Sequence, residues 1–349
     1  MLQMGVHARV SNSPSEDVIL LAHGSGGTLS HDLIADHLLS HIGNKTLGRL
    51  DDSAVLEAKG RVAFTTDSYV VDPIFFPGGD IGKLAVCGTV NDLSAIGATP
   101  LCISLALIIE EGFPTAHLDR IMESVQATCN EAGIEVVTGD TKVVNRGKAD
   151  KLFINTAGVG TIPEGIDVSG HNARPGDRVL LSGTIADHGV AIMGSREGLS
   201  FSSDIESDCA PLNSLVAAML RVGGDAVHAM RDPTRGGLAS TLNEITSQSG
   251  TGIRIEESSV PVNAGVRAAC EMLGLDPLYV ANEGKLIAIV APDSAPAVLK
   301  AMRGHRNGAS AVDIGEVADD KHGRVTMRTM MGPTRLVPML AGELLPRIC

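Results

Sequence analysis

The chain has 349 residues, 44% of them hydrophobic, and a formal net charge of -13. This length accommodates one large or two medium cores, and two is the better expectation. The acidic balance argues against a nucleic-acid partner, because such binding depends on clustered Lys and Arg. The longest apolar stretch, residues 84–109, is interrupted by Asn91, Asp92 and Pro100, so it predicts no membrane helix. The first residues also lack a basic segment leading into an apolar one, and we expect a cytoplasmic protein.

Apolar periodicity and turn residues divide the chain into two series of strands and helices. In the first series, strands are predicted at 61–66, 134–138 and 151–158, and helices at 81–96 and 117–132. A turn-rich stretch at 163–176 precedes the second series, which runs from a strand at 178–182 to one at 286–290. The alternation predicts an α/β (α+β) fold. Residues 335–349 have two prolines and no helical period, which predicts a mobile tail.

Acidic residues recur at strand edges and helix starts in the first series. They lie in LDDSAV (Asp51 and Asp52), TTDS (Asp67), VNDL (Asp92) and TGDTK (Asp140). One such aspartate is commonly a cap or a turn former. Several carboxylates that converge repel each other unless a hard cation joins them, and such oxygen-rich sets suit Mg²⁺ with a nucleotide's phosphates. Together the four motifs therefore predict a magnesium and phosphate site.

Two glycine-rich stretches offer backbone amides to phosphates. The first is HGSGG, which contains Gly24, Ser25, Gly26 and Gly27 and runs into a helical stretch. It has neither the Walker A ending nor the dinucleotide-binding GxGxxG, so a plain turn is the alternative. The second is RDPTRGG, residues 231–237, which combines an acid, a cation and a diglycine. A capped helix start is the alternative there.

The six cysteines show no CxxC pair and no compact spacing, which argues against a zinc knuckle or a disulfide framework. Five of them have apolar or small neighbours and are expected to be buried thiols. Cys349 differs because it is the last residue of the chain. Its α-carboxylate is expected to raise the pKa of the thiol, and either Arg347 or a partner protein is the candidate source of an offsetting positive charge.

The motifs, taken in order, resemble the HypE family of hydrogenase maturation factors. The resemblance covers nearly the whole chain from His23, through LDDSAVL, GTVNDLSAIGA, VTGDTKVV, RDPTRGG and ANEGKL, to the terminal PRIC. The family belongs to a superfamily of ATP-using enzymes that includes aminoimidazole ribonucleotide synthetase, selenophosphate synthetase and thiamine monophosphate kinase. The acidic motifs are shared across the superfamily, whereas PRIC is particular to the HypE family.

The resemblance implies a two-domain PurM-like fold. It implies a homodimer whose N-terminal domains share a β-barrel, with ATP and Mg²⁺ in the cleft between the domains. The implied parts are an N-terminal arm with the Gly-rich loop (1–42), an ATP-binding and dimerisation domain (43–162), a C-terminal α/β domain (163–335) and a flexible tail (336–349).

The resemblance also implies the ligands of ATP and Mg²⁺. The implied metal ligands are Asp52, Asp67, Asp92, Asp140 and Asp232, with Asp51 left open as an alternative to Asp52. The implied nucleotide-binding residues are Gly24, Ser25, Gly26, Gly27, Asp67, Lys83, Asn91, Asp140, Thr141, Thr234 and Gly236.

The implied activity gives the terminal thiol a role. In the HypE family, the carbamoyltransferase HypF places a carbamoyl group on this cysteine, and ATP then drives dehydration of the S-carboxamide to an S-cyanate. The cyano group passes to iron held by a HypC-HypD complex and becomes a ligand in NiFe hydrogenase. Loss of the nitrogen's protons needs a base, for which Glu283 and Lys142 are the candidates. Glu283 is preferred, because a lysine among aspartates stays charged, and Arg235 is expected to stabilise developing phosphate charge.

Two other hypotheses remain open from the sequence. One is an ATP-dependent enzyme that phosphorylates a free small molecule, although HGSGG lacks the reactive cysteine or selenocysteine of selenophosphate synthetases. The other is a nucleotide-responsive scaffold whose apolar C-terminus is a docking peptide.

Overall fold

The computed structural model describes residues 18–24, 28–50, 53–198, 205–342, 345 and 347–349. Its strands are β1 (Arg61–Tyr69), β2 (Phe75–Phe76), β3 (Gly79–Asp80), β4 (Thr99–Glu110), β5 (Glu135–Val144), β6 (Leu152–Ile162), β7 (Arg178–Leu181), β8 (Val227–Arg231), β9 (Gly252–Glu256), β10 (Ile287–Val290), β11 (Val312–Ala318), β12 (Val325–Arg328) and β13 (Thr334–Leu336). Its α-helices are α1 (Thr28–Leu33), α2 (Ser40–Ile42), α3 (Ile81–Ala95), α4 (Thr115–Ala132), α5 (Asp187–Arg196), α6 (Asn213–Gly223), α7 (Gly237–Ser249), α8 (Ala264–Leu273) and α9 (Ala295–Arg303). None of the helices among these residues is both long and apolar enough to cross a membrane.

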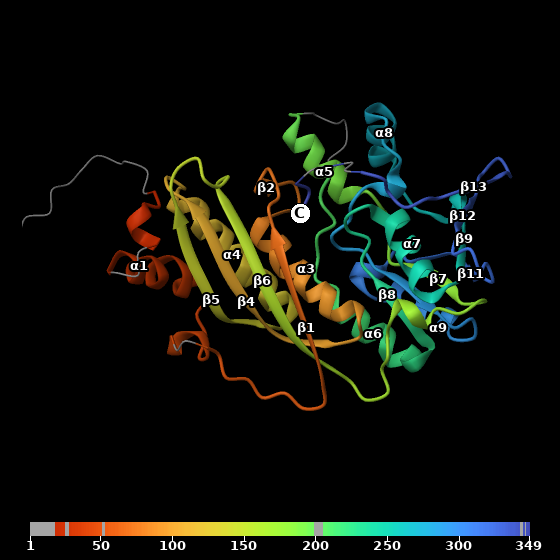
Figure 1. Cartoon of the computed structure of the whole chain (residues 1–349), viewed down its shortest axis with the longest axis horizontal. Helices are drawn as coiled ribbons and strands as arrows, with labels where there is room; N and C mark the ends of the chain where they lie inside the picture. Colours follow the sequence, from red (N-terminus) through yellow and green to blue (C-terminus); the bar gives the residue numbers. More distant parts are fainter. Residues whose placement is uncertain (1–17, 25–27, 51–52, 199–204, 343–344, 346) are drawn as a thin grey trace, which may run out of the picture.

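The N-terminal half is a four-stranded sheet in the order β1-β6-β4-β5, with α3 and α4 packed on one face (Figure 1). Asp80 caps α3 by accepting hydrogen bonds from the backbone N–H groups of Gly82 and Lys83. The predicted strands and helices of this half are confirmed, and the strands are longer than predicted. Strand β4 was not predicted, because its apolar run continues directly from that of α3 and shows no separate period.

The other face of this sheet has no covering layer among the described residues. Along each strand, side chains that lie on this open face alternate with side chains buried on the helix-covered face. Val62 is 51% exposed and Phe64 is 69% exposed, whereas Ala63 between them is buried. Ile108 on β4 is also 43% exposed. The open face of the sheet is therefore apolar, which is typical of an interaction surface.

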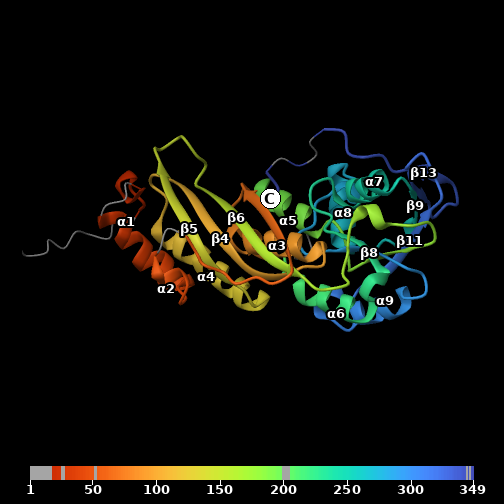
Figure 2. The same cartoon turned by 60° about the horizontal axis from the view of Figure 1, so that its bottom comes forward.

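The C-terminal half is a seven-stranded sheet in the order β13-β12-β9-β11-β7-β10-β8, with helices on both faces (Figure 2). Alternate residues of one strand enter different cores. On β10, Ile287 and Ile289 pack toward α7, whereas Ala288 and Val290 pack toward α6 and α9. The predicted strands at 178–182 and 286–290 are confirmed as β7 and β10.

The two halves share a core where the chain ends. Ile192, Cys209 and Ala281 of the C-terminal half belong to the same apolar cluster as the residues of α3. Ile348 joins this cluster and is only 3% exposed. The C-terminus thus lies between the two halves (Figure 1), and the structure seats the end of the predicted mobile tail in a packed position.

Candidate active site

The last residues run beside the segment that follows β1. The backbone N–H of Val70 donates to an α-carboxylate oxygen of Cys349 at 3.2 Å, and that of Asp72 donates to the carbonyl oxygen of Arg347 at 3.3 Å. A cavity of about 390 Å³ adjoins the terminal residue. It is lined by Ser68, Val70, Arg235, Gly236, Tyr279, Ala281, Leu340, Gly342, Leu345, Arg347, Ile348 and Cys349. The thiol therefore has room for a small substituent.

Charged groups of both signs face the thiol of Cys349. Burial, followed by the negative charges of Glu283 and Asp67, raises its pKa to about 12, and Arg235 partly offsets this by its charge and a hydrogen bond. The guanidinium of Arg235 also lies 4.0 Å from Asp67 Oδ1. The expectation for Arg347 was wrong. That side chain instead donates to the carbonyl oxygen of Val70 and pairs with Asp150, so Arg235 is the cation at the thiol.

The main chain of Glu283 is held on both sides. Its N–H donates to Asp208 Oδ1 at 3.0 Å, and its carbonyl oxygen accepts from Asn91 Nδ2 at 3.3 Å. A Cβ on the next residue, Gly284, would lie 1.8 Å from the carbonyl oxygen of Asp208, so only glycine fits there. Glu283 Oε1 is buried without a hydrogen-bond partner among the described residues. Burial, then the neighbouring Cys209 and Asp232, raise the pKa of this carboxyl well above its usual range.

Three of the predicted metal ligands lie near Cys349 and Glu283. Asp92 on α3 accepts a hydrogen bond from the Thr65 hydroxyl at 2.9 Å, and burial raises its pKa with a further contribution from Asp67. Burial and the charge of Asp92 raise the pKa of Asp232 to about 7. We refer to Asp67, Asp92 and Asp232 as the acidic cluster. The charges of Asp67 and Asp92 favour the protonated form of Asp232, as neighbouring like charges do.

The acidic cluster suits a Mg²⁺ ion that is shared with phosphate groups. Within the described ranges, no three His, Cys, Asp or Glu side chains are placed closely enough to hold a metal ion by themselves. Mg²⁺ in nucleotide sites is usually held by one or two carboxylates together with the substrate's phosphates. The hard oxygen donors of the cluster suit that shared arrangement and not a cage made by protein alone.

Other predicted residues form a second group on β5. Asp140 Oδ1 accepts from Lys142 Nζ at 2.7 Å and from the Thr141 N–H at 2.9 Å. Gly24 packs against the same strand, since a Cβ on it would lie 2.7 Å from the Val143 nitrogen. A cavity of about 290 Å³ is lined by both segments. Gly24 and the GDTK motif thus meet, as a nucleotide site requires.

One chain does not bring these two groups together. Asp67 lies on β1 and Asp140 on β5, at opposite edges of the sheet. Three strand spacings separate them, roughly 14 Å. The two aspartates also lie on opposite faces of the sheet. Asp67 is two residues from the buried Tyr69 and so shares its face, which the helices cover. Asp140 pairs in register with Ala106, which shares the open face with the exposed Ile108 two residues further on. The expected convergence of all the aspartates, and of Lys142 with Glu283, is therefore not formed within one chain.

The remaining predicted residues divide into three sets. Gly236 lines the cavity at Cys349, directly after Thr234 and Arg235. Asn91 and Lys83 differ from expectation. Asn91 is only 1% exposed, and the hydrogen bonds of its side-chain amide to main-chain groups link the two halves. Lys83 Nζ donates to the Gly78 carbonyl oxygen at 2.8 Å. Asn91 thus has a structural role in the free chain, and the nucleotide contacts of Asn91 and Lys83 stay predictions. Ser25, Gly26, Gly27, Asp51 and Asp52 lie outside the described residues.

Several residues at this site were not predicted from the sequence. Asp208, which holds Glu283, has a side chain only 3% exposed and lies 75 positions away in the chain. His188 and Arg196 on α5 bind main-chain carbonyl groups of the last residues. No local pattern marks these residues, because their contacts join segments that are distant in sequence.

The fold and the site agree with the comparisons to known proteins. Residues 50–162 match the N-terminal domain of AIR synthase related proteins, and residues 174–328 match the C-terminal domain. The chain is thus a two-domain protein of the AIR synthase related class.

Closer relatives narrow this class. The carbamoyl dehydratase HypE of Bradyrhizobium diazoefficiens is 56% identical over 330 residues, covering 94% of this chain and 95% of the relative. HypE of Escherichia coli is 45% identical, over 95% and 99% of the two chains. The chain belongs to the HypE family of carbamoyl dehydratases.

Solved structures are similar over the same length. A hydrogenase maturation protein HypE in complex with ATP superposes with a TM-score of 0.91 at 50% identity, covering 95% of this chain and 99% of that one. A HypE-HypF complex gives a TM-score of 0.79 at 48% identity, covering 90% and 100%.

Proposed function

We propose that this chain catalyses ATP-dependent dehydration of an S-carboxamide on its own Cys349, giving an S-cyanate that supplies the cyanide ligand of NiFe hydrogenase. The observation that carries the proposal is the position of the terminal thiol. It lies at a cavity of about 390 Å³, between the cation of Arg235 and the buried carboxyl of Glu283, beside the acidic cluster. The names of the relatives and the ATP complex of a similar protein support the same reaction.

In the proposed reaction, ATP supplies the phosphoryl group that activates the carboxamide oxygen. The carboxamide oxygen attacks the terminal phosphorus of ATP, ADP leaves, and the oxygen becomes part of a good leaving group. The nitrogen loses two protons as the C–O bond breaks, which yields the S-cyanate, ADP and phosphate. Phosphorylation is needed because an amide oxygen is a poor leaving group, and proton removal needs a base near the nitrogen.

Glu283 is proposed as the base. Three observations support this: its main chain is fixed, its buried Oε1 has no hydrogen-bond partner among the described residues, and its charge acts on the thiol of Cys349. A raised pKa makes its ionised form a strong proton acceptor. Arg235 is proposed to orient the carboxamide and to stabilise the phosphate charge, since it is held between Cys349 and Asp67.

The acidic cluster is proposed to hold Mg²⁺ together with the phosphates of ATP. The ion would neutralise phosphate charge near the carboxamide. Asp232 and Asp92, with their raised pKa values, would gain most from a cation, because it removes their mutual repulsion.

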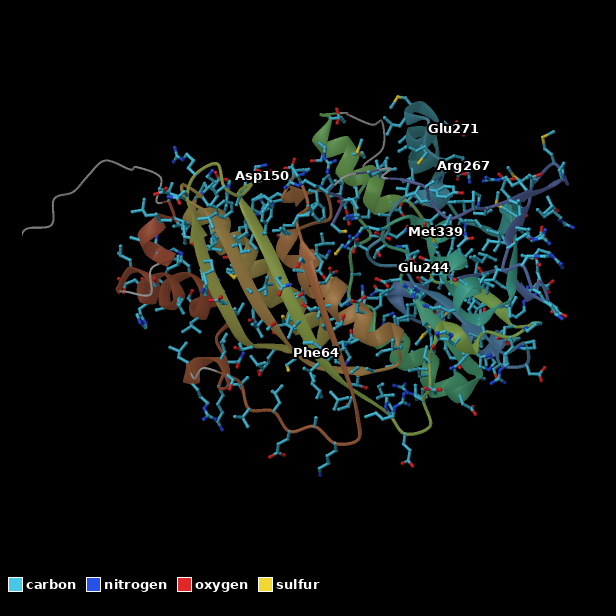
Figure 3. The ribbon with its side chains drawn as sticks, in the orientation of Figure 1. Phe64, Asp150, Glu244, Arg267, Glu271 and Met339 are labelled. Atoms are coloured by element: carbon cyan, nitrogen blue, oxygen red, sulfur yellow. The ribbon has the colours of Figure 1, made fainter. Side chains whose placement is uncertain are left out.

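A second copy of the chain is proposed to supply the group on β5. The open sheet face with Val62, Phe64 and Ile108 offers an apolar surface on which two sheets would close into the shared β-barrel. Figure 3 shows Phe64 at the far end of this sheet from Asp150. In the homodimer, Asp140 and Lys142 of one protomer would serve the site of the other, because no arrangement of the single sheet brings them to Cys349.

The proposal includes two partners. A HypF-type carbamoyltransferase loads Cys349, in keeping with the solved complex of a similar protein with HypF. A HypC-HypD complex receives the cyano group. To meet both, the tail must also leave the cleft, so the docked position is proposed to be one of two states.

Intact mass spectrometry tests the proposed function. The chain is incubated with a HypF-type enzyme, carbamoyl phosphate and ATP, desalted, and then given ATP again. We expect one carbamoyl group on Cys349 and then the loss of one water. A chain that gains no adduct at Cys349 contradicts the proposal, and a Cys349→Ala variant is the matched control.

A further inference from the structure

Helix α5 presents a row of side chains to the end of the chain. His188, Ile192 and Arg196 are spaced four residues apart, which places them along one face of the helix. Ile192 packs in the same cluster as Ile348. The two polar members of the row each bind one carbonyl group of the last residues. This face of α5 therefore contacts the end of the chain at three points, through Ile192 and through hydrogen bonds to the carbonyl groups of Arg347 and Ile348.

His188 binds the carbonyl oxygen of Ile348. Its Nε2 lies 2.8 Å from that oxygen and must donate, because a carbonyl oxygen only accepts. The other nitrogen, Nδ1, therefore accepts from the Ser207 hydroxyl at 2.8 Å, while Ser207 Oγ accepts from the N–H of Cys209 at 3.1 Å. Burial lowers the pKa of His188, which agrees with a neutral ring. A fully buried histidine is thus fixed in the tautomer that binds the tail.

Arg196 and Asp150 bind the next residue back. Arg196 Nη2 donates to the carbonyl oxygen of Arg347 at 2.8 Å and also to that of Asp72 at 2.6 Å. The side chain of Arg347 donates to the Val70 carbonyl oxygen at 2.9 Å and pairs with Asp150. Arg347 also has a φ of 50°, which residues with a Cβ adopt only at an energetic cost. Its contacts must outweigh that cost in the docked tail.

We propose that His188, Arg196 and Asp150 are positioning residues that form a clamp for the last three residues, Arg347, Ile348 and Cys349, and so place the thiol beside Glu283. The role of the clamp in catalysis rests on the proposed function, whereas docking of the tail is a property of the chain without ATP or partners. The clamp binds two main-chain oxygens and the Arg347 side chain, and its three members hold the tail without a hydrogen bond to the Cys349 sulfur among the described contacts. The free thiol, the S-carboxamide and the S-cyanate should therefore dock alike.

Alkylation of the full-length chain tests the clamp without ATP, carbamoyl donor or partner. Iodoacetamide labelling of each cysteine is followed by peptide mass spectrometry. A docked Cys349 reacts slowly, because its thiol is partly buried and faces carboxylates. His188→Leu removes one hydrogen bond and should speed labelling of Cys349 up to about tenfold. His188→Gln keeps a donor near the Nε2 position and should restore slow labelling.

The ion pair at the surface provides a second test that does not touch the core. Asp150→Arg and Arg347→Asp should each speed labelling of Cys349, and the two together should recover part of the protection. Asp167→Asn, which breaks an exposed ion pair with Arg61 elsewhere, is the matched control and should change nothing.

The five other cysteines report on general loosening of the fold. They are all buried, so they should stay protected in every variant. Equal Cys349 labelling in His188→Leu and the unmodified chain would overturn the proposal. So would faster labelling of all six cysteines together, because that would show a structural role. Failure of the dehydration reaction with these labelling results intact would instead count against the proposed function.

Discussion

Replacing Asp232 by Asn should stabilise the protein, and the effect should grow with pH. Burial and the neighbouring Asp92 raise the pKa of Asp232 from 3.8 to about 7. Between these two values, the unfolded chain releases the proton before the folded chain does, so stability falls as pH rises. An Asn at this position cannot ionise and escapes that loss.

The size of the effect follows from the shift. A change of about three pKa units corresponds to about 4 kcal/mol at 1.36 kcal/mol per unit. Because Asp232 keeps some contact with solvent, screening reduces this, and we expect about 2 kcal/mol at pH 8. Near pH 4 the two proteins should be equally stable.

Urea unfolding of both proteins at several pH values measures this difference. The free energy of unfolding of the variant should exceed that of the unmodified chain by an amount that rises between pH 4 and pH 8. An Asn variant that is less stable at pH 8, or a difference independent of pH, would refute the reasoning about the acidic cluster. The same variant should bind ATP with Mg²⁺ more weakly, which is the usual exchange of function for stability.

Three further outcomes are expected. Cys349→Ala should abolish carbamoyl loading yet leave ATP binding intact; unchanged turnover of a free substrate would favour a different enzyme. The Glu283→Gln variant should accept the carbamoyl group but dehydrate it about a hundredfold or more slowly. The dehydration rate of the unmodified chain should rise with pH as the Glu283 carboxyl ionises. A variant that is as fast as the unmodified chain would remove Glu283 as the base. Asp67→Asn and Asp140→Asn should each be inactive alone, whereas their mixture should regain about a quarter of the active sites through mixed dimers. A mixture that stays inactive after exchange of subunits would place both residues in one protomer's site.

The sequence predicted the elements with a clear period. Helix α4 was found at 117–132 because its apolar residues repeat with helical spacing, and the structure has it at Thr115–Ala132. Strand β4 was missed because it is buried on one side within a continuous apolar run, which periodicity cannot separate from a helix.

The site was predictable only in part, for a physical reason. The motifs identified the chemistry of Asp67, Asp92 and Asp232, and the structure groups these three. Whether Asp140 joins them depends on strand order, which places β1 and β5 at opposite edges. Strand order is set by contacts between distant segments, so no local motif reveals it. The clamp on α5 was missed for the same reason, since His188 and the carbonyl group it binds are 160 positions apart.

The fate of the carboxamide oxygen tests the central proposal most directly. Cys349 is loaded with a carbamoyl group that carries oxygen-18 in its carbonyl, the protein is desalted, and ATP with Mg²⁺ is added for one turnover. We expect the label to appear in inorganic phosphate while the Cys349 peptide becomes an S-cyanate. Unlabelled phosphate, with the oxygen-18 retained on Cys349 or released as water, would contradict it.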